Sequence, residues 1–308
     1  MISILLATYN GEKYIREQID SILGQTVDNF TLYINDDKST DSTFDIAGEY
    51  TKQYPGKIIA TQNEANSGHA KLNFMDMIIS RKDDYLMLCD QDDVWLPDKI
   101  EKSLSAIKKL ESEHGVQTPL LVHTDLEIVN ENLETMSSSY FELEDINTNQ
   151  KTLNKIVARN IAPGCSIMYN RALSDLITTK SSDIIMHDWW LVLIAAALGE
   201  TDTIFEKTIL YRQHSTNEIG IVKVKTIGHI VSKLINFKKA KKVLTDTYNQ
   251  ASVFLDNFEK LLSKDQKDFL QKFCDIPNHT KIVRWVMVCR LGVLKKGVLR
   301  KISSFIFI

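Results

Sequence analysis

The sequence predicts an α/β protein, with a mainly parallel sheet flanked by helices and a C-terminal helical region. Three observations support this fold class. Short apolar runs alternate with helical patterns, two of these runs end in aspartates, and the composition becomes lysine-rich and helical after residue 222. Strands joined by helices of about 10–15 residues imply right-handed crossovers and a parallel sheet that is covered on both faces.

The elements follow in order along the chain. Strands are expected at Ile2–Ala7, Phe30–Asn35, Lys57–Thr61, Tyr85–Cys89 and Leu120–Thr124. Helices are expected at Tyr14–Leu23, from the polar turn after Asn35 to Gln53, at Lys71–Ser80 and at Pro97–Glu113. Beyond Asn160 the alternation weakens, and the candidates are a strand at Cys165–Tyr169, an apolar helix at Asp188–Leu198 and an extended run at Thr203–Arg212.

Charge divides the chain into two regions, 1–222 and 223–308. The first carries 19 basic and 34 acidic side chains, and the second carries 18 basic and 6 acidic ones. The first region is long enough to bury a globular core. Because it is acidic and contains no nucleic-acid motif, nucleic acid is not an expected partner. We expect the basic region to bind an anionic membrane surface or to join copies into a homo-oligomer.

The cysteines, the N-terminal segment and the length of the apolar runs bear on the cellular compartment of the protein. Four cysteines lie far apart, so free thiols in a reducing compartment are expected in place of a disulfide framework or a zinc knuckle. The start MISILLATYNGEK has no basic lead and no cleavage site, so it is expected to be a strand and not a signal peptide. No apolar run reaches about 18 residues, the length that a spanning helix needs.

Asp90-Gln91-Asp92-Asp93 is the most informative motif, and it directly follows an apolar strand. Three carboxylates within four residues repel one another, and a divalent cation relieves that conflict. Oxygen ligands at a strand end suit Mn²⁺ or Mg²⁺ that holds a diphosphate. A solvated turn ahead of the Pro97 helix is the structural alternative.

Asp36-Asp37 forms a second acidic strand end. Asp41 or Ser39 is expected to cap the helix that follows, which explains part of this polar cluster. Capping explains the pair itself less well, because ligands of open α/β sheets bind at the carboxyl ends of the strands.

His187-Asp188-Trp189-Trp190 opens the apolar helix. A helix start favours the ionised carboxylate of Asp188, which a general base requires. The two tryptophans offer flat faces to the apolar side of a sugar ring, and buried packing explains at least one of them equally well.

Two further segments carry groups that suit phosphate. In Arg212-Gln213-His214 the histidine alone is more often structural than a ligand, but its cationic and amide neighbours suit a diphosphate. Lys71 lies at a glycine-containing helix start, where it is either a surface lysine or a phosphate contact.

Together these motifs resemble inverting glycosyltransferases of family 2, which have the nucleotide-sugar-binding GT-A fold. The resemblance covers Ile2 to Gly220 and rests on SILLATYNGEKYIREQIDSILGQT, DDKSTDST, NSGHAKLN and DQDD. Lys38 stands where the family usually has glycine, and His187 replaces the acid that is more common before the catalytic aspartate.

The resemblance implies a role for each matched residue. Asp90 would serve the ribose or the metal, Asp92 would bind the metal, and Asp188 would be the catalytic base. Independently of the resemblance, the flat rings of Trp189 and Trp190 are expected to face the acceptor. The residues that would contact the nucleotide are Ala7, Tyr9, Glu12, Asp37 and Lys71.

One subgroup of the family is the most similar. NIAPGCSIMYNRAL, HDWWLVLIAAALG and ILYRQHSTN resemble bacterial rhamnosyltransferases that use dTDP-L-rhamnose to build surface polysaccharides. In that subgroup the histidine of R-Q-H lies near the metal and diphosphate, which would be His214 here. The implied reaction is the metal-dependent, inverting transfer of L-rhamnose to a saccharide linked to polyprenyl diphosphate, in the cytoplasm at the inner face of the membrane.

Three other functions compete with this one. The same fold would also serve another nucleotide sugar, such as a UDP-hexose. A non-catalytic membrane-associated scaffold would not need the intact acids. A dinucleotide-binding oxidoreductase would need a G-x-G-x-x-G turn after the first strand, and Ala7-Thr8-Tyr9-Asn10-Gly11 contains none.

The basic region lies outside the resemblance. Its lysine clusters 238–242 and 295–296 accompany the apolar stretches Ile282–Leu294 and Ile302–Ile308. A basic, apolar helical region is typical of attachment to an anionic leaflet. The cations of 284–301 scatter around the helix axis, so a helical bundle with solvated lysines is the alternative.

Overall fold

In the computed structural model the described residues are 1–146, 151–178, 180–214 and 237–294. They form two compact units. The first comprises Met1–Ile146, Ala162–Lys180 and Gly199–Ile221, and the second comprises Asn147–Ile161, Ser181–Leu198 and Val222–Ile308. The second unit therefore takes two segments from ahead of residue 222, whereas the charge pattern divides the chain only once.

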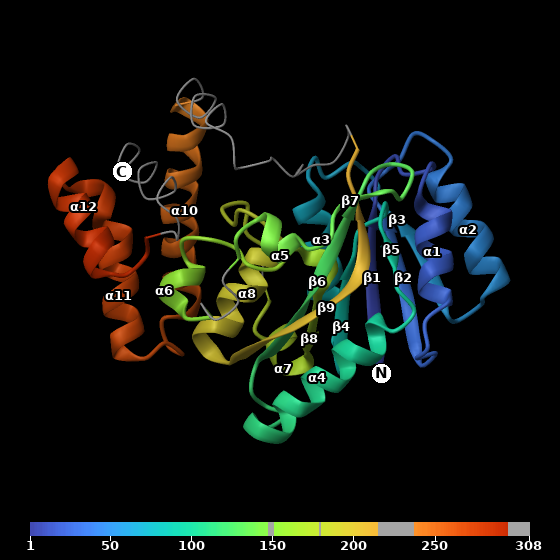
Figure 1. Ribbon diagram of the computed structural model, residues 1–308, viewed down its shortest axis with the longest axis horizontal. Coiled ribbons are helices and arrows are strands. Elements are labelled where there is room, and N and C mark those ends of the chain that lie inside the picture. The colour runs from blue at the N-terminus through green and yellow to red at the C-terminus, as the bar shows by residue number, and fades with distance from the viewer. Residues whose placement is uncertain (147–150, 179, 215–236, 295–308) are drawn as a thin grey trace. The chain divides into compact units, whose positions relative to one another are not determined.

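The first unit contains a nine-stranded sheet with helices beside it (Figure 1). The strand order is β3-β2-β1-β4-β8-β6-β9-β5, and β7 pairs with β6. The strands are β1 (Ile2–Thr8), β2 (Phe30–Asp36), β3 (Ile58–Gln62), β4 (Tyr85–Cys89), β5 (Val94–Trp95), β6 (Leu120–Val129), β7 (Thr135–Ser137), β8 (Ile167–Asn170) and β9 (Glu200–Arg212).

The first four strands are parallel to one another, as the alternation of strands and helices predicts. β8 then runs antiparallel to both β4 and β6, whereas β6 and β9 are parallel. The short β5 pairs antiparallel with β9 and brings the chain after β4 to the far side of the sheet. The α/β fold class, with helices flanking the sheet and a helical C-terminal region, is confirmed.

The helices of this unit place an apolar stripe against the sheet. In α1 (Ile15–Leu23) the buried residues Ile15, Gln18, Ile19 and Ile22 recur at the spacing of one helix face. The other helical segments are α2 (Thr43–Gln53), α3 (Ala70–Ser80), α4 (Lys99–His114), α5 (Tyr140–Leu143), the 3₁₀ turn η1 (Gly164–Ser166) and α7 (Arg171–Asp175).

The central position of β1 explains its composition. All seven of its residues are buried, since it lies between β2 and β4 with both faces covered. β2, nearer the edge, alternates buried and half-buried residues. The parallel register pairs Thr8 with Asp36 and Leu6 with Cys89, so these strands end at the same edge of the sheet. The acids that follow β2 and β4 therefore meet there.

The second unit contains α6 (Leu153–Ile156), α8 (His187–Leu198), α10 (Phe237–Phe258), α11 (Lys264–Asp275), the 3₁₀ turn η2 (Ile276–Asn278) and α12 (Lys281–Arg290). α8 belongs with the C-terminal helices because it is apolar on every side. The ring of Trp190 packs on those of Phe254 and Phe258 of α10, at centroid distances of 5.4 and 5.9 Å.

The C-terminal region is helical wherever it is described, as its sequence pattern predicts. Among the described residues, no helix has the length and apolarity that crossing a membrane requires. The side chains of 238–240, the lysines at 295–296 and the stretch Ile302–Ile308 lie outside the residues that the structure describes.

Candidate active site at the carboxyl ends of the strands

Asp36 and Asp37 organise the end of β2. The buried Asp36 carboxylate accepts hydrogen bonds from Thr8 Oγ1 at 3.0 Å and from Gln62 Nε2 at 2.9 Å. The Asp37 carboxylate, also buried, accepts bonds from Asn63 Nδ2 at 2.7 Å and from the amide and hydroxyl of Ser67 at 2.9 and 2.7 Å. Asp37 thus fixes the segment 63–67 against the strand end. Its contact with a nucleobase stays a prediction.

The turn after β2 explains why the resembled family usually has glycine where this chain has Lys38. Lys38 has a φ of 63°, in the left-handed region that glycine adopts with least cost. The expectation that Asp41 or Ser39 caps α2 is wrong, because the N-cap residue is Ser42; Asp41 accepts a hydrogen bond at 3.0 Å from the amide of Thr43, the first residue of α2. Ser39 bonds elsewhere, accepting from the amide of Asn10 at 2.9 Å.

The segment after β1 is tied to the acidic loop by the Gln91 side chain. Its amide accepts from the backbone N–H of Tyr9 at 2.9 Å and donates to the Tyr9 carbonyl at 3.0 Å. A Cβ on Gly11 would lie 2.2 Å from Gln91 Oε1, so a residue without a side chain suits this close approach. Ala7 is buried beneath this turn and the Tyr9 side chain is exposed.

Glu12 and Lys71 both belong to the first unit. Glu12 Oε2 accepts a hydrogen bond at 3.0 Å from the amide of Ser42, the N-cap residue of α2. Lys71 is half-buried in the first turn of α3, whose N-cap is His69. The nucleotide contacts expected of Ala7, Tyr9, Glu12 and Lys71 stay predictions.

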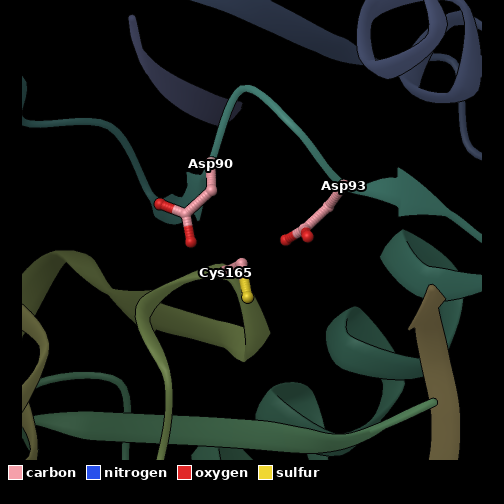
Figure 2. A group of neighbouring side chains, drawn as sticks. All are labelled: Asp90, Asp93 and Cys165. Carbon is pink, nitrogen blue, oxygen red and sulfur yellow. The ribbon is translucent and has the colours of Figure 1, made fainter. Parts of the chain in front are cut away.

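The three acids of the DQDD loop have different surroundings. Asp90 is half-buried, the Asp92 side chain is 14% exposed and Asp93 is 1% exposed. Figure 2 shows the carboxylates of Asp90 and Asp93 pointing into the same space beside the Cys165 thiol. One oxygen of each and Cys165 Sγ all lie within 4.8 Å of one another. The acidic loop and the 3₁₀ turn η1 therefore converge at this point.

Asp93 is the innermost acid. Its Oδ1 accepts a hydrogen bond from the Arg212 amide at 3.0 Å. Among the described residues, no nitrogen or oxygen donor bonds to its Oδ2. Burial, together with the charges of Asp92 and Asp90, raises the pKa of Asp93 well above its ordinary value.

Asp92 meets His214. The distance from His214 Nε2 to Asp92 Oδ2 is 2.6 Å, and the His214 side chain is 8% exposed. The two residues are 122 positions apart in the sequence, and the end of β9 brings them together. At this distance the two groups are hydrogen-bonded to each other, and a carboxylate oxygen and an imidazole nitrogen are donors that a divalent cation can take once that bond opens. The donor chemistry of Asp92 and His214 therefore suits Mn²⁺ or Mg²⁺, whereas the place of Asp90 in such a site stays a prediction, because its carboxylate lies beside Asp93 and Cys165.

Arg212 serves the protein itself in this structure. Its Nε donates to the Asp92 carbonyl at 2.8 Å, its Nη1 donates to the Glu131 carbonyl at 2.6 Å, and its Nη2 pairs with the Glu17 carboxylate. The side chain is only 3% exposed. The sequence suggests a diphosphate contact for this residue, but the guanidinium faces inward and these three nitrogens already bond to protein acceptors.

Lys99 is a buried cation that none of the sequence motifs indicates. It is fully buried, its Nζ lies 4.7 Å from the centroid of the Trp95 ring, and no hydrogen-bond acceptor for Nζ is found among the described residues. Burial lowers the pKa of this amine from 10.5 to about 8, which the nearby Cys165, Cys89 and Asp93 oppose. Its place beside Ile100 on the buried face of α4 is the sequence signal that points to it.

The segment His187–Trp190 lies in the second unit, at the start of α8. Asp188 is buried, and its Oδ1 accepts from the Trp189 amide at 2.5 Å. Trp189 Nε1 donates to the Ile156 carbonyl at 2.7 Å, so both tryptophans are used in packing. Burial lowers the pKa of His187 to about 3 and keeps it neutral. The roles of Asp188 as base and of Trp189 and Trp190 as acceptor contacts stay predictions.

The sequence of this chain matches a known family. The family model described as Glycosyl transferase family 2 matches residues 3–177. The dTDP-rhamnosyl transferase RfbG of Shigella flexneri is 29% identical over 247 residues, covering 74% of this chain and 80% of that protein. The putative glycosyltransferase EpsE of Bacillus subtilis is 34% identical over 122 residues, covering 39% of this chain and 43% of that protein.

A solved structure shares the fold. The crystal structure of S. aureus TarS 1-349 in complex with UDP-GlcNAc matches with a TM-score of 0.57, covering 99% of this chain and 86% of that one. At 18% sequence identity this likeness shows the fold alone. It confirms the GT-A-like architecture that the sequence resemblance implies.

Proposed function

Because this chain belongs to glycosyl transferase family 2, we propose that it transfers L-rhamnose from dTDP-L-rhamnose to a saccharide linked to polyprenyl diphosphate. The donor is supported by the likeness to RfbG, named as a dTDP-rhamnosyl transferase, over most of both chains. The observation that carries the proposal is the meeting of Asp92 with His214 at the carboxyl edge of the sheet. These residues come from the two segments to which the resemblance assigns the metal and the diphosphate.

In the proposed mechanism, Asp92, His214 and Asp90 would hold Mn²⁺ or Mg²⁺. When bound, the metal neutralises charge on the leaving diphosphate. Asp188 accepts the proton of an acceptor hydroxyl while the hydroxyl oxygen forms a bond to the anomeric carbon of the donor sugar. The bond from that carbon to the diphosphate breaks, and dTDP leaves with the electron pair. The start of α8 favours an ionised carboxylate at Asp188, and the neutral His187 adds no competing cation beside it.

Replacing the base tests the chemical step. Asp188→Asn keeps the size of the side chain and its acceptance of the Trp189 amide, but it cannot take a proton. We expect sugar transfer to fall about 10²- to 10⁴-fold, with dTDP binding nearly unchanged. Glu142→Gln, at an exposed residue of the short helix α5 in the first unit, is the control for loss of an acid elsewhere. Transfer by the Asp188 variant at more than a tenth of the normal rate would exclude it as the base.

Replacing Asp92 tests the metal. Asp92→Asn should weaken dTDP binding roughly 10- to 100-fold in Mn²⁺ and leave the weaker binding in EDTA unchanged, because the lost interaction passes through the ion. Isothermal titration with and without the metal measures both. An equal loss in the two conditions would mean that Asp92 does not act through a metal.

The donor is tested with a panel of nucleotide sugars. We expect dTDP-L-rhamnose to give the largest metal-dependent rise in melting temperature and to be the sugar that is transferred. A larger rise in melting temperature with a UDP-hexose would show that the donor is not dTDP-L-rhamnose, but the protein would still be a glycosyltransferase. Binding without release of any nucleoside diphosphate would support the non-catalytic scaffold.

We also propose that α12 attaches the protein to an anionic membrane surface at the inner face of the cell membrane. Ile282, Val283 and Val286 are 80%, 41% and 40% exposed and lie on neighbouring positions of one helix face. Residues 281–308 contain seven basic side chains and no acidic one. An exposed apolar stripe in a purely cationic segment complements anionic lipid.

Vesicle sedimentation tests this attachment. The protein should bind vesicles that contain phosphatidylglycerol, bind phosphatidylcholine alone much less, and dissociate as salt is raised. Ile282→Asp should weaken binding, whereas Phe205→Asp, at a 67% exposed residue of the first unit, should not. No binding to anionic vesicles at low salt would exclude the membrane. A change of molecular mass on Ile282→Asp would assign the face to a second copy of the chain.

A further inference from the structure

The guanidinium of Arg212 joins three segments around the Asp92–His214 pair. It reaches the carbonyl of Asp92 in the acidic loop, the carbonyl of Glu131 beyond β6, and the carboxylate of Glu17 on α1. Its own backbone amide donates to Asp93. One buried side chain therefore fixes the distance between the end of β9 and the DQDD loop.

Tyr14, the N-cap residue of α1, completes this arrangement. Its ring stacks with that of His214 at a centroid distance of 5.0 Å and an interplanar angle of 25°. The Cζ of Arg212 lies 4.7 Å from the centroid of the same ring. A stacked imidazole has its plane fixed, and the plane of the ring decides where Nε2 points.

We infer that Arg212 and Tyr14 are positioning residues, which hold His214 Nε2 toward Asp92 so that both ligands are in place before the metal arrives. The inference rests on the proposed metal role of that pair. Groups that orient a ligand lower the cost of assembling the site on binding, and their loss weakens metal affinity even though they never touch the ion.

The alternative for Arg212 is direct contact with the diphosphate. The two roles predict different results. A diphosphate ligand would matter for dTDP with or without metal, and lysine would replace much of its charge. A positioning residue acts through His214, so its loss appears only in metal-dependent binding. Lysine would not replace it, because a single ammonium cannot span the three acceptors that the guanidinium reaches.

Four variants separate these roles. Arg212→Lys and Arg212→Met test the guanidinium, and Tyr14→Phe and Tyr14→Leu test the ring. Tyr50→Leu is the matched control for Tyr14→Leu, since Tyr50 and Tyr14 are 8% and 9% exposed and Tyr50 lies on α2 with its hydroxyl bonded to Asp20. Arg16→Met is the control for loss of an arginine elsewhere, in an exposed pair with Glu49.

The measurements are the Mn²⁺ dissociation constant in the presence of dTDP, and dTDP binding in EDTA. Both arginine variants and Tyr14→Leu should raise the Mn²⁺ constant roughly tenfold or more. Tyr14→Phe, Tyr50→Leu and Arg16→Met should leave it within about twofold, and dTDP binding in EDTA should not change for any of them. In a His214→Ala background, Tyr14→Leu should have no further effect, because the group that it positions is gone.

Two results would overturn the inference alone. One is an unchanged Mn²⁺ constant in Tyr14→Leu and Arg212→Met while Asp92→Asn still abolishes metal-dependent binding. The other is an Arg212→Met loss of equal size with Mn²⁺ and with EDTA, which would make Arg212 a diphosphate ligand. A wild-type protein that binds dTDP equally with and without metal would overturn the proposed metal site together with the inference.

Discussion

Lys38 has a backbone conformation that its side chain disfavours. Its φ of 63° costs an L-residue about 1–2 kcal/mol, whereas glycine adopts it freely. Lys38→Gly should therefore raise the free energy of unfolding by about 0.5–1 kcal/mol, after the larger entropy of glycine in the unfolded chain is subtracted. Urea denaturation measures this change.

Lys38→Ala is the control, because it removes the same side chain and its bond of 3.3 Å to Gln62 but keeps the strained φ. Alanine should give no gain. Equal stabilisation by alanine and glycine would mean that the lysine side chain, and not the backbone, is the unfavourable feature.

The buried amine of Lys99 makes stability depend on alkaline pH. Its pKa is lowered to about 8 in the folded protein from 10.5 in the unfolded chain. Between these values the unfolded chain binds a proton that the folded protein does not, so stability rises with pH across this window. Lys99→Met should be the more stable protein at pH 7, and its advantage should shrink from pH 8 to 10.5.

Denaturation curves across this pH range check the prediction. Lys102→Met, at a half-buried lysine of the same helix paired with Asp98, is the control and should follow the wild-type pH trend. A Lys99→Met advantage that stays constant across the range would show that lost charge at this position is not the cause.

At the residue scale, the sequence predicts which acids gather but not what holds them. Asp36, Asp37 and the DQDD acids follow strands, so their meeting at one edge can be expected from parallel pairing alone. The clamp of Gln91 on Tyr9 spans 82 residues and the bond of Arg212 to Asp92 spans 120. No local pattern encodes such contacts, so the sequence does not show that the Arg212 side chain bonds to Asp92, Glu131 and Glu17.

Among the elements, the start of β9 depends on a glycine. A Cβ on Gly199 would lie 1.8 Å from the carbonyl oxygen of Pro119, a backbone atom that cannot move without disturbing the start of β6. Gly199→Ala should lower the free energy of unfolding by about 3 kcal/mol or more.

Gly48 is the matched control, since it lies inside α2 with nothing within 4 Å of its would-be Cβ. Gly48→Ala should raise stability by about 0.5–1 kcal/mol, because alanine favours the helix. Thermal denaturation of both variants measures the contrast. A Gly199→Ala protein as stable as the wild type would mean that the Pro119 turn relaxes at little cost.

The elements that the sequence predicts best are the periodic helices and the buried apolar strands. Tyr85–Cys89 agrees at both ends with β4, and the helices expected at Tyr14–Leu23 and Pro97–Glu113 begin and end within two residues of α1 and α4. The short β5, β7 and α5 carry too few residues for a period to appear, and they form because neighbouring strands or Asp125 support them.

At the scale of the whole molecule, charge and packing divide the chain differently. The charge pattern separates 1–222 from 223–308, but the second unit also takes 147–161 and 181–198. Charge reports on surfaces, whereas α8 is buried along most of its length and its place depends on which apolar groups cover it. The position of β8 between β4 and β6 likewise depends on contacts between residues far apart in the sequence, and the local pattern of each strand does not predict it.

The buried position of α8 has a consequence for folding during synthesis of the chain. Trp190 leaves the ribosome well before its partners Phe254 and Phe258, and a synthesis rate of about 5–20 residues per second makes that delay several seconds. During this interval the apolar surface of α8 is not yet buried by α10. A chain truncated after Ile221 would lack Phe254 and Phe258, so α8 would stay exposed. The basic region therefore cannot be removed without affecting folding. A chaperone that binds α8 should raise the yield of the full chain.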